Sequence, residues 1–141
     1  MVKKRVSNKV FFMVLVVAIT LLGSVCFARW SYLVETSNGL SKTTTTLGRK
    51  ALDCYGTTMV DCYVGAGVRV ILQTLDQDGD WVTVTGWTDY HSDFAGVEEV
   101  IAVSDGTYRL HVQHTAYAED DTDFSDPLEI HHSYSSIQTY P

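Results

Sequence analysis

Short runs of alternating apolar and polar residues, separated by Gly and Asp clusters at intervals of roughly ten residues, dominate the chain after Arg49. Alternation with a period of two is typical of β-strands, and no segment after residue 28 has helical periodicity. The pattern predicts strands near residues 50–56, 58–64, 67–75, 80–87, 97–103, 106–118 and 127–134. Seven such strands predict an all-β fold, an antiparallel two-sheet β-sandwich of the immunoglobulin-like or jelly-roll-like kind.

The alternation also predicts which face of each strand is buried. In TYRLHVQHTAY, residues 107–117, one parity is predominantly apolar and is predicted to face the core. Its members are Tyr108, Leu110, Val112, His114 and Ala116. The other parity, which includes Arg109, His111 and Gln113, is expected to face solvent or a ligand. The strand that contains Trp81 and Trp87 carries apolar residues on both faces, so the pattern does not assign its inward side.

Residues 1–28 have the order of a secretory signal peptide. Four basic residues come first, and an apolar run of about 13 residues follows, which is too short for a membrane anchor. CFA at residues 26–28 then supplies the small residues of a cleavage site. Cys26 also raises lipidation as an alternative, but Val25 precedes it, where a lipobox requires Gly, Ala or Ser. The chain ends in SSIQTYP, with no apolar tail, so we expect a protein that is secreted and has no membrane contact after signal cleavage.

The remaining 113 residues are expected to form one domain. Residues 29–48 are small, polar and rich in threonine, which predicts a flexible lead-in, with a short edge strand as the alternative. Residues 49–141 are then the β-sandwich. Signal cleavage removes four of the ten Lys and Arg and none of the 17 Asp and Glu, which leaves a formal charge of −11. Nucleic acid, whose binding depends on cationic contacts, is therefore excluded as a partner.

Two cysteines, Cys54 and Cys62, remain after signal cleavage. An even number of cysteines in a secreted chain favours a disulfide between them. Structural zinc requires a second nearby pair of ligands, which this chain lacks.

The stretch DQDGD, residues 76–80, is the closest approach to a calcium loop. Asp76, Asp78 and Asp80 imitate the first three ligands of an EF-hand, but the positions that require Gly and a bidentate Glu are both Trp, and no helices flank the loop. The alternative is a hairpin turn at Asp78-Gly79 between two strands, and we favour it. We therefore predict no metal site. If calcium did bind, these three aspartates would be the candidate ligands.

A second acidic run, AEDDTDFSDP at residues 118–127, is predicted to be a solvated loop, with a divalent-cation site as the alternative. The five histidines do not form a metal site by spacing. His111 and His114 are expected on opposite faces of one strand, as are the neighbours His131 and His132, and His91 lies in a loop without a nucleophile. We predict His114 to be a core histidine, hydrogen-bonded between the sheets.

The chain has no nucleophile elbow, no available Cys–His pair and no zinc-binding helix. We therefore predict no enzyme, no catalytic residue and no cofactor. Three tryptophans and eight tyrosines could instead provide stacking surfaces for sugar rings, and Trp87 and Tyr90 are the candidates. The alternative is that these aromatic residues fill the core of the sandwich.

Two segments, LQTLDQDGDWVTVTGW at residues 72–87 and DGTYRLHVQHTAY at residues 105–117, resemble a family of small uncharacterised secreted proteins of Gram-positive, clostridia-like bacteria. The resemblance covers roughly residues 56–118 and implies a β-sandwich without an established active site. It carries eight pattern positions onto this chain, each more readily structural than catalytic: Gln73, Gly79, Trp81, Trp87, Gly106, Tyr108, Arg109 and His114. Cys54 and Cys62 lie outside that pattern.

These observations predict a secreted, acidic, non-catalytic binding or interaction module for an extracellular glycan or protein. The first alternative is a carbohydrate-binding module that uses exposed aromatic side chains. The second is a small bacteriocin-like effector, against which the acidic charge counts, because it opposes attack on anionic membranes.

Overall fold

The computed structural model describes residues 31–61 and 64–141, so the predicted signal peptide and Cys62 lie outside the described residues. Residues 31–141 form one compact unit. Two antiparallel sheets pack against each other in it, and its described residues contain no helix, which confirms the β-sandwich. No helix in the described ranges is long and apolar enough to cross a membrane.

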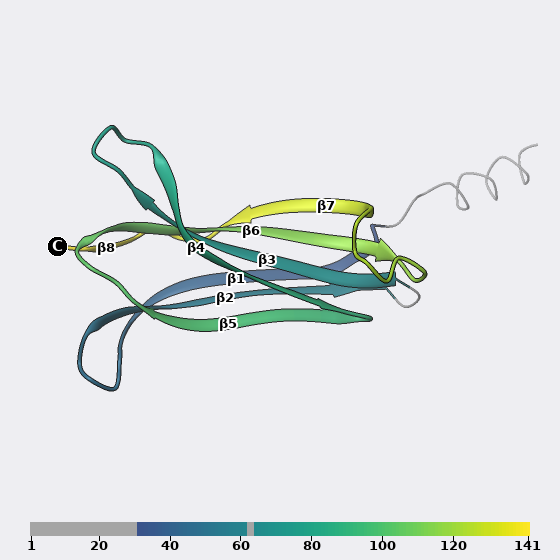
Figure 1. Cartoon of the computed structure of the whole chain (residues 1–141), viewed down its shortest axis with the longest axis horizontal. Coiled ribbons are helices and arrows are strands. Elements are labelled where there is room, and N and C mark those ends of the chain that lie inside the picture. The colour runs from purple at the N-terminus through teal and green to yellow at the C-terminus, as the bar shows by residue number, and fades with distance from the viewer. Residues whose placement is uncertain (1–30, 62–63) are drawn as a thin grey trace, which may run out of the picture. The chain divides into compact units, whose positions relative to one another are not determined.

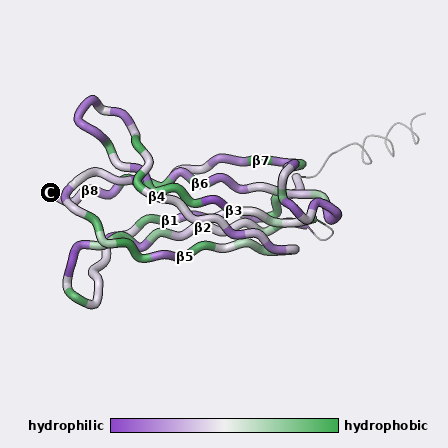
Figure 2. The backbone as a smooth tube through the Cα atoms, viewed as in Figure 1, coloured by the Kyte–Doolittle hydropathy of each residue, from purple (hydrophilic) through white to green (hydrophobic). Residues whose placement is uncertain are grey.

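Eight strands build the two sheets (Figure 1). In chain order they are β1 (Leu33–Thr44), β2 (Lys50–Val60), β3 (Val64–Leu75), β4 (Trp81–His91), β5 (Phe94–Ala102), β6 (Gly106–Ala118), β7 (Pro127–Tyr134) and β8 (Gln138–Tyr140). The smaller sheet has the order β1-β2-β5, and the larger sheet has the order β4-β3-β6-β7, with β8 also paired to β6. The β1–β2 and β3–β4 hairpins extend at the same end as the C-terminus, and the tip of the β3–β4 hairpin is hydrophilic (Figure 2).

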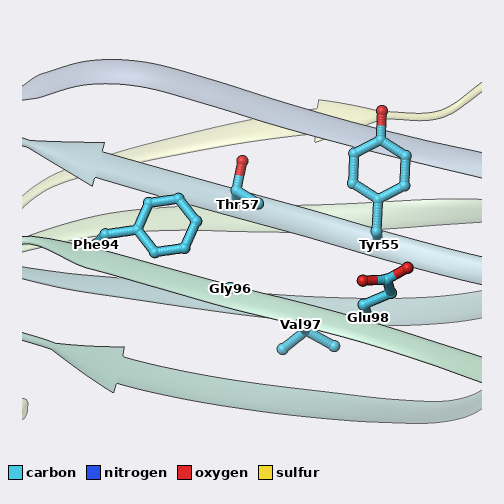
Figure 3. Close-up of a pocket in the computed structure, with 6 residues that line it drawn as sticks. All are labelled: Tyr55, Thr57, Phe94, Gly96, Val97 and Glu98. Carbon is cyan, nitrogen blue, oxygen red and sulfur yellow. The ribbon is translucent and has the colours of Figure 1, made fainter.

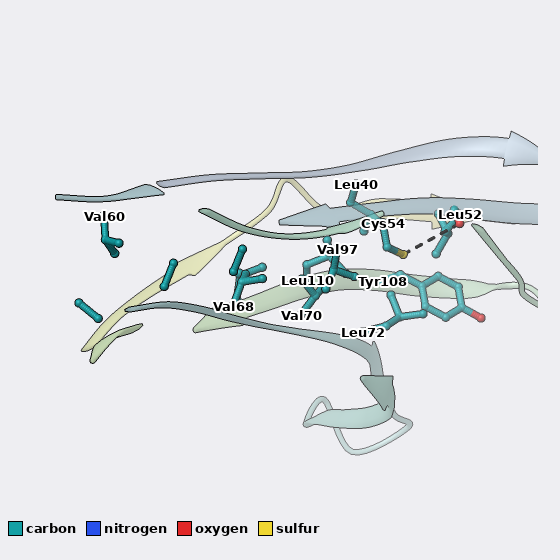
Figure 4. Packing of buried hydrophobic residues seen from close by; sticks show 14 of the residues in the cluster. Leu40, Leu52, Cys54, Val60, Val68, Val70, Leu72, Val97, Tyr108 and Leu110 are labelled. Carbon is teal, nitrogen blue, oxygen red and sulfur yellow. Dashed lines mark hydrogen bonds between the residues drawn. The ribbon is translucent and has the colours of Figure 1, made fainter. Parts of the chain in front are cut away.

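The core lies between the inner faces of the two sheets (Figure 4). The larger sheet contributes Val68, Val70 and Leu72 from β3, together with the predicted inward residues of β6, all of them buried. The smaller sheet contributes Leu40, Leu52, Cys54, Val60, Ala95 and Val97. The alternation therefore assigned the buried face of β6 correctly, because this strand pairs regularly with β3.

The boundary between the predicted strands 50–56 and 58–64 is wrong, because residues 50–60 form one strand, β2, and Val64 begins β3. The strand continues past Gly56 and through Thr57 in register with both β1 and β5. The glycine is required by packing: a Cβ at Gly56 would lie 2.7 Å from Val70 Cγ2 and 3.0 Å from Val112 Cγ1. Gly56 therefore allows the two sheets to approach closely at this point.

The predicted flexible lead-in at residues 29–48 is also wrong, because Leu33–Thr44 forms the edge strand β1. It pairs with β2 from Leu33↔Val60 to Thr44↔Lys50. Leu40 is its one buried residue, and its exposed polar positions face solvent, as is usual for an edge. The polar composition predicted disorder, whereas the hydrogen bonds of a long register and the threonine strand propensity fix the segment in the sheet.

A β-bulge in β4 determines which faces of the sheet Trp81 and Trp87 occupy. The register pairs Thr85 with Leu72 but Thr83 with Gln73, so Val84 is the extra residue. Trp81 and Trp87 have the same parity in sequence, yet the bulge places them on opposite faces. Trp87 packs against the core, and Trp81 lies on the outer face of the larger sheet.

Cys54 is a buried free thiol between the sheets, so the predicted disulfide is not formed there. The physical reason is the length of β2. The strand continues for six residues beyond Cys54, which places Val60 about 20 Å away. A disulfide requires Cα atoms within about 7 Å of each other, so the far end of β2 is out of reach of Cys54.

We predict that Cys54 resists thiol reagents in the folded protein. Burial raises its pKa to about 12, with the charges of Asp53 and Glu99 adding to the effect, so the reactive thiolate is scarce at neutral pH. Iodoacetamide at pH 8, followed by peptide mass spectrometry, should modify Cys54 only after denaturation. A peptide map in which Cys54 is joined to Cys62 would contradict this assignment.

Candidate ligand-binding surfaces

The DQDGD stretch forms the hairpin turn between β3 and β4, as predicted. One carboxylate oxygen of Asp76 accepts the backbone N–H groups of Asp78 (2.9 Å) and Asp80 (2.8 Å). Gly79 has a φ of 88°, which a side chain would disfavour. Asp76 is therefore committed to the turn. No group of three or more His, Cys, Asp or Glu side chains in the described ranges could hold a metal ion.

The second acidic run also folds onto itself. The Asp121 carboxylate accepts the backbone N–H groups of Ser125 (3.1 Å) and Asp126 (2.9 Å). These donors, the Asp126 N–H first, lower the pKa of Asp121. Its negative charge stabilises the loop between β6 and β7.

His114 is a fully buried core histidine, as predicted. Its Nδ1 lies 2.9 Å from Thr58 Oγ1, and its Nε2 lies 2.8 Å from Ser133 Oγ, which also accepts a hydrogen bond from Asn38 Nδ2 (2.7 Å). This chain of hydrogen bonds joins the two sheets. Although a Ser–His contact is a feature of hydrolases, no substrate can reach this one, because His114 has no exposed surface.

The two aromatic candidates from the sequence both pack against other side chains, although Tyr90 is 40% exposed. Trp87 is partly buried against the core. Tyr90 stacks on Phe124 with ring centroids 4.7 Å apart and meets the ring of Tyr117 edge-on at 5.9 Å. Burial, and then the neighbouring Tyr117, raise the pKa of Tyr90.

The outer face of the smaller sheet carries a groove of about 430 Å³, within the size range of small-ligand sites (Figure 3). We call it the Phe94 groove, and its lining residues are Tyr55, Thr57, Phe94, Gly96, Val97 and Glu98. Phe94 lies at one end and Tyr55 at the other, with Thr57 and Gly96 between them. Phe94 pairs with Met59, four residues from Tyr55 on β2, so the two aromatic residues are about 13 Å apart along the strand.

Both aromatic rings of the groove lie over glycines. Phe94 Cε1 is 3.0 Å from the position of a Cβ on Gly96, and Tyr55 Cε1 is 2.1 Å from that of Gly39. Because these glycines have no side chains, the rings rest on the backbone of the sheet. Their other sides stay accessible, since Phe94 is 48% exposed and Tyr55 is 39% exposed. The groove therefore presents two ring surfaces at its ends, with the Thr57 hydroxyl and the Glu98 carboxylate as polar groups.

The outer face of the larger sheet has a different chemistry. The guanidinium of Arg109 lies 4.2 Å from the ring centroid of Trp81 and 4.7 Å from that of Tyr134, and its Nε donates to Gln73 Oε1 at 2.9 Å. The ring of His111 also stacks on Tyr134, with the ring centroids 4.8 Å apart. These rings therefore contact a guanidinium or another ring, and Tyr134 is still 55% exposed.

Two further cationic or titratable groups extend this outer face. His132 stacks on His111, with Nε2 of His111 2.9 Å from Nδ1 of His132. Arg69 is exposed on β3. We call this surface the arginine face, and its residues are Arg69, Gln73, Trp81, Arg109, His111, His132 and Tyr134.

The sequence predicted the faces of some of these residues but not which of them would come into contact. His111 and His114 do lie on opposite faces, as do His131 and His132, but the β6–β7 register also brings His111 and His132 together. Three pattern positions, Gln73, Trp81 and Arg109, meet in one stack. Tyr108, whose hydroxyl donates to the Ser104 carbonyl, and Gly79 have structural positions. The Phe94 groove was missed, although the exposed alternation of Tyr55 with Thr57 was a usable signal.

Comparison of the chain with known protein families, curated proteins and solved structures finds no match. The resemblance to small secreted proteins stays a prediction.

Proposed function

We propose that the domain is a secreted, non-catalytic carbohydrate-binding module and that the Phe94 groove is its binding site. The observation that carries this proposal is the pair of exposed rings, Phe94 and Tyr55, resting on glycines at the two ends of one groove. The C–H faces of sugar rings pack on such aromatic surfaces, and the resulting burial of apolar area favours binding.

The polar groups of the groove favour a neutral glycan. The Glu98 carboxylate is exposed and has no hydrogen bond or ion pair with another described residue, so it is available to accept hydroxyl hydrogens. No outward position of β1, β2 or β5 near the groove is Lys or Arg, as their registers place Glu35, Ser37, Gly39, Asp53, Thr57, Gly96 and Glu98 there. An acidic sugar would be repelled by this surface.

The same geometry supports binding without catalysis. Glycoside hydrolysis needs two carboxyl groups on opposite sides of one bond, with an environment that separates their pKa values. Among the described residues that line the groove, Glu98 is the only carboxylate, and it is solvent-exposed. We therefore expect reversible binding and no turnover of the glycan.

Replacing Phe94 by alanine is expected to weaken binding of neutral oligosaccharides by about tenfold or more, because a central aromatic contact is removed. The wild-type domain is first screened on an array of neutral oligosaccharides, and the best binder is then titrated calorimetrically against each variant. Phe94→Trp retains a ring over Gly96 and should retain most of the affinity. Tyr55→Ala should reproduce the loss at the other end of the groove.

The control is Leu47→Ala, because Leu47 is 81% exposed in the β1–β2 hairpin and lies outside the groove. It should bind as the wild type does. The proposal fails if the wild type binds no neutral glycan, or if Phe94→Ala and Tyr55→Ala both bind with unchanged affinity.

A further inference from the structure

The side chain of Arg109 is held in place but its charge is not neutralised. Trp81 and Tyr134 enclose its guanidinium, and Gln73 takes the Nε hydrogen. Neither Nη nitrogen has a hydrogen bond or ion pair with another residue of the described ranges. A guanidinium fixed in this way is pre-organised to bind a planar anion through two parallel hydrogen bonds.

The arginine face is free of negative charge in an otherwise acidic domain. Residues 31–141 contain all 17 Asp and Glu of the chain against five Lys and Arg. The outward positions defined by the β3, β4, β6 and β7 registers include no Asp or Glu. Two of the five cations, Arg69 and Arg109, are at these positions. No carboxylate of the face itself therefore competes for either arginine.

A second cationic position lies along the same face. Arg69 lines a polar recess of about 200 Å³ together with Tyr90, Gln113, Thr115 and Tyr117. Arg69 is four residues from Gln73 on β3, and Gln73 pairs with Arg109, so the two guanidinium positions are separated by about 13 Å along the strands. His111, which pairs with Ile71, lies between them. The two guanidinium groups and His111 therefore lie on one line parallel to the strands.

We propose that the arginine face is a second ligand surface, which binds an acidic polysaccharide through the carboxylates of two non-adjacent uronate sugars of one chain. Arg109 and Arg69 each bind a carboxylate. The histidine pair, His111 and His132, adds positive charge between them when it is protonated. This inference is independent of the Phe94 groove, which is formed by the other sheet.

Charge density favours a polysaccharide over a nucleic acid. A nucleic acid carries closely spaced phosphates, and its binding depends on many cationic contacts, which a domain with 17 acidic and five basic residues cannot supply. A uronate polymer carries one carboxylate per acidic sugar. Two arginines on one line can bind it while the acidic loops at the strand ends stay in solvent.

The test measures binding of polygalacturonate by the soluble domain, residues 29–141, with calorimetry at low salt. Arg109→Gln and Arg69→Gln are each expected to weaken binding by about tenfold, since each removes a charge-assisted hydrogen-bonded pair. Arg49→Gln is the matched control, because Arg49 lies in the connection between β1 and β2 and off this face. Phe94→Ala should bind polygalacturonate normally, which separates this proposal from the one for the groove.

Arg69 is not part of the Trp81–Arg109–Tyr134 stack, so Arg69→Gln tests the face even if Arg109→Gln perturbs folding. Unchanged binding by Arg69→Gln and by folded Arg109→Gln would overturn the proposal. So would an equal loss in Arg49→Gln, or equally tight binding of single-stranded DNA or of a neutral galactan.

The histidine pair gives a second readout. The side chains that face His111 and His132 come from β3, β6 and β7, and none of them is acidic. They are Arg69, Gln73, Arg109, Gln113 and Tyr134. Burial, His132, Arg109 and Arg69 lower the pKa of His111, so His111 gains charge only below its usual range. Affinity for polygalacturonate should rise as the pH falls from 8 to 5.5, where uronate carboxylates stay ionised.

His111→Gln should flatten that rise. The comparison with the wild type cancels the general gain in positive charge that acid produces throughout the domain. An identical pH profile in His111→Gln would contradict the assigned role of the histidine pair.

Discussion

Lowering the pH from 7 to 4 is expected to reduce the free energy of unfolding by roughly 3 kcal/mol through His114 alone. Burial, followed by the charge of His131, lowers the pKa of His114 to about 4 in the folded domain. In the unfolded chain the group titrates near 6.5. Between these two values the unfolded state binds the proton and the folded state does not, so stability falls as the pH falls through this window and levels off below it.

Urea unfolding at pH values from 4 to 8 measures this dependence. His114→Gln removes the titrating group, and its stability should depend less on pH than that of the wild type by the same amount. At pH 7 the variant should be less stable by about 1–3 kcal/mol, because Thr58 and Ser133 lose part of their hydrogen bonding. His91→Gln is the matched control, because the His91 side chain is largely exposed.

Acid has a second, opposite effect in this domain, because protonation of its many carboxylates relieves their mutual repulsion. This effect is common to the wild type and both histidine variants, so the difference between their pH profiles isolates His114. Parallel profiles for the wild type and His114→Gln would show that the buried position does not perturb the histidine.

Gly56→Ala is expected to lower the free energy of unfolding by about 2 kcal/mol. The new Cβ would meet Val70 Cγ2 at 2.7 Å and Val112 Cγ1 at 3.0 Å, and both partners belong to the opposite sheet. The substitution also restricts the unfolded chain, which offsets less than about 1 kcal/mol of this cost. Denaturant unfolding at pH 7 measures the net effect.

Gly39→Ala is the matched control, because its Cβ would meet only the ring of Tyr55, the nearest atom at 2.1 Å. Tyr55 is exposed and can rotate away, so stability should change by less than about 0.5 kcal/mol. The rotation moves a ring of the Phe94 groove, so glycan binding should weaken while the fold stays intact. Equal stability losses in the two variants would show that Gly56 does not mark a close contact between the sheets.

The sequence by itself determined the fold class and the buried faces of the regular strands. Strand β6 follows the alternation without interruption, so Tyr108, Leu110, Val112, His114 and Ala116 could be assigned to the core. The Asp78-Gly79 turn was also predictable, because the local preference of glycine for positive φ is a property of the residue itself. Each of these features depends on near neighbours in the chain.

Only the tertiary structure decided which distant residues meet. The bulge at Val84 places Trp81 and Trp87 on opposite faces although they have the same parity in the sequence. The alternation of apolar and polar residues does not reveal this extra residue. The β6–β7 register decides that His132 meets His111 and that Tyr134 meets Arg109. Register is set by the packing of whole strands, so the arginine face is invisible in the sequence.

The continuity of β2 past Gly56 and the place of Cys54 also depended on the tertiary structure. A glycine within a strand is a break by local preference, but here the opposite sheet leaves no room for a side chain. An extended strand separates its residues by about 3.3 Å each, so Val60, which is close to Cys54 in sequence, is distant from it in space. Local chemistry specified the strands, and the register of the strands within each sheet specified the surfaces that we propose for binding.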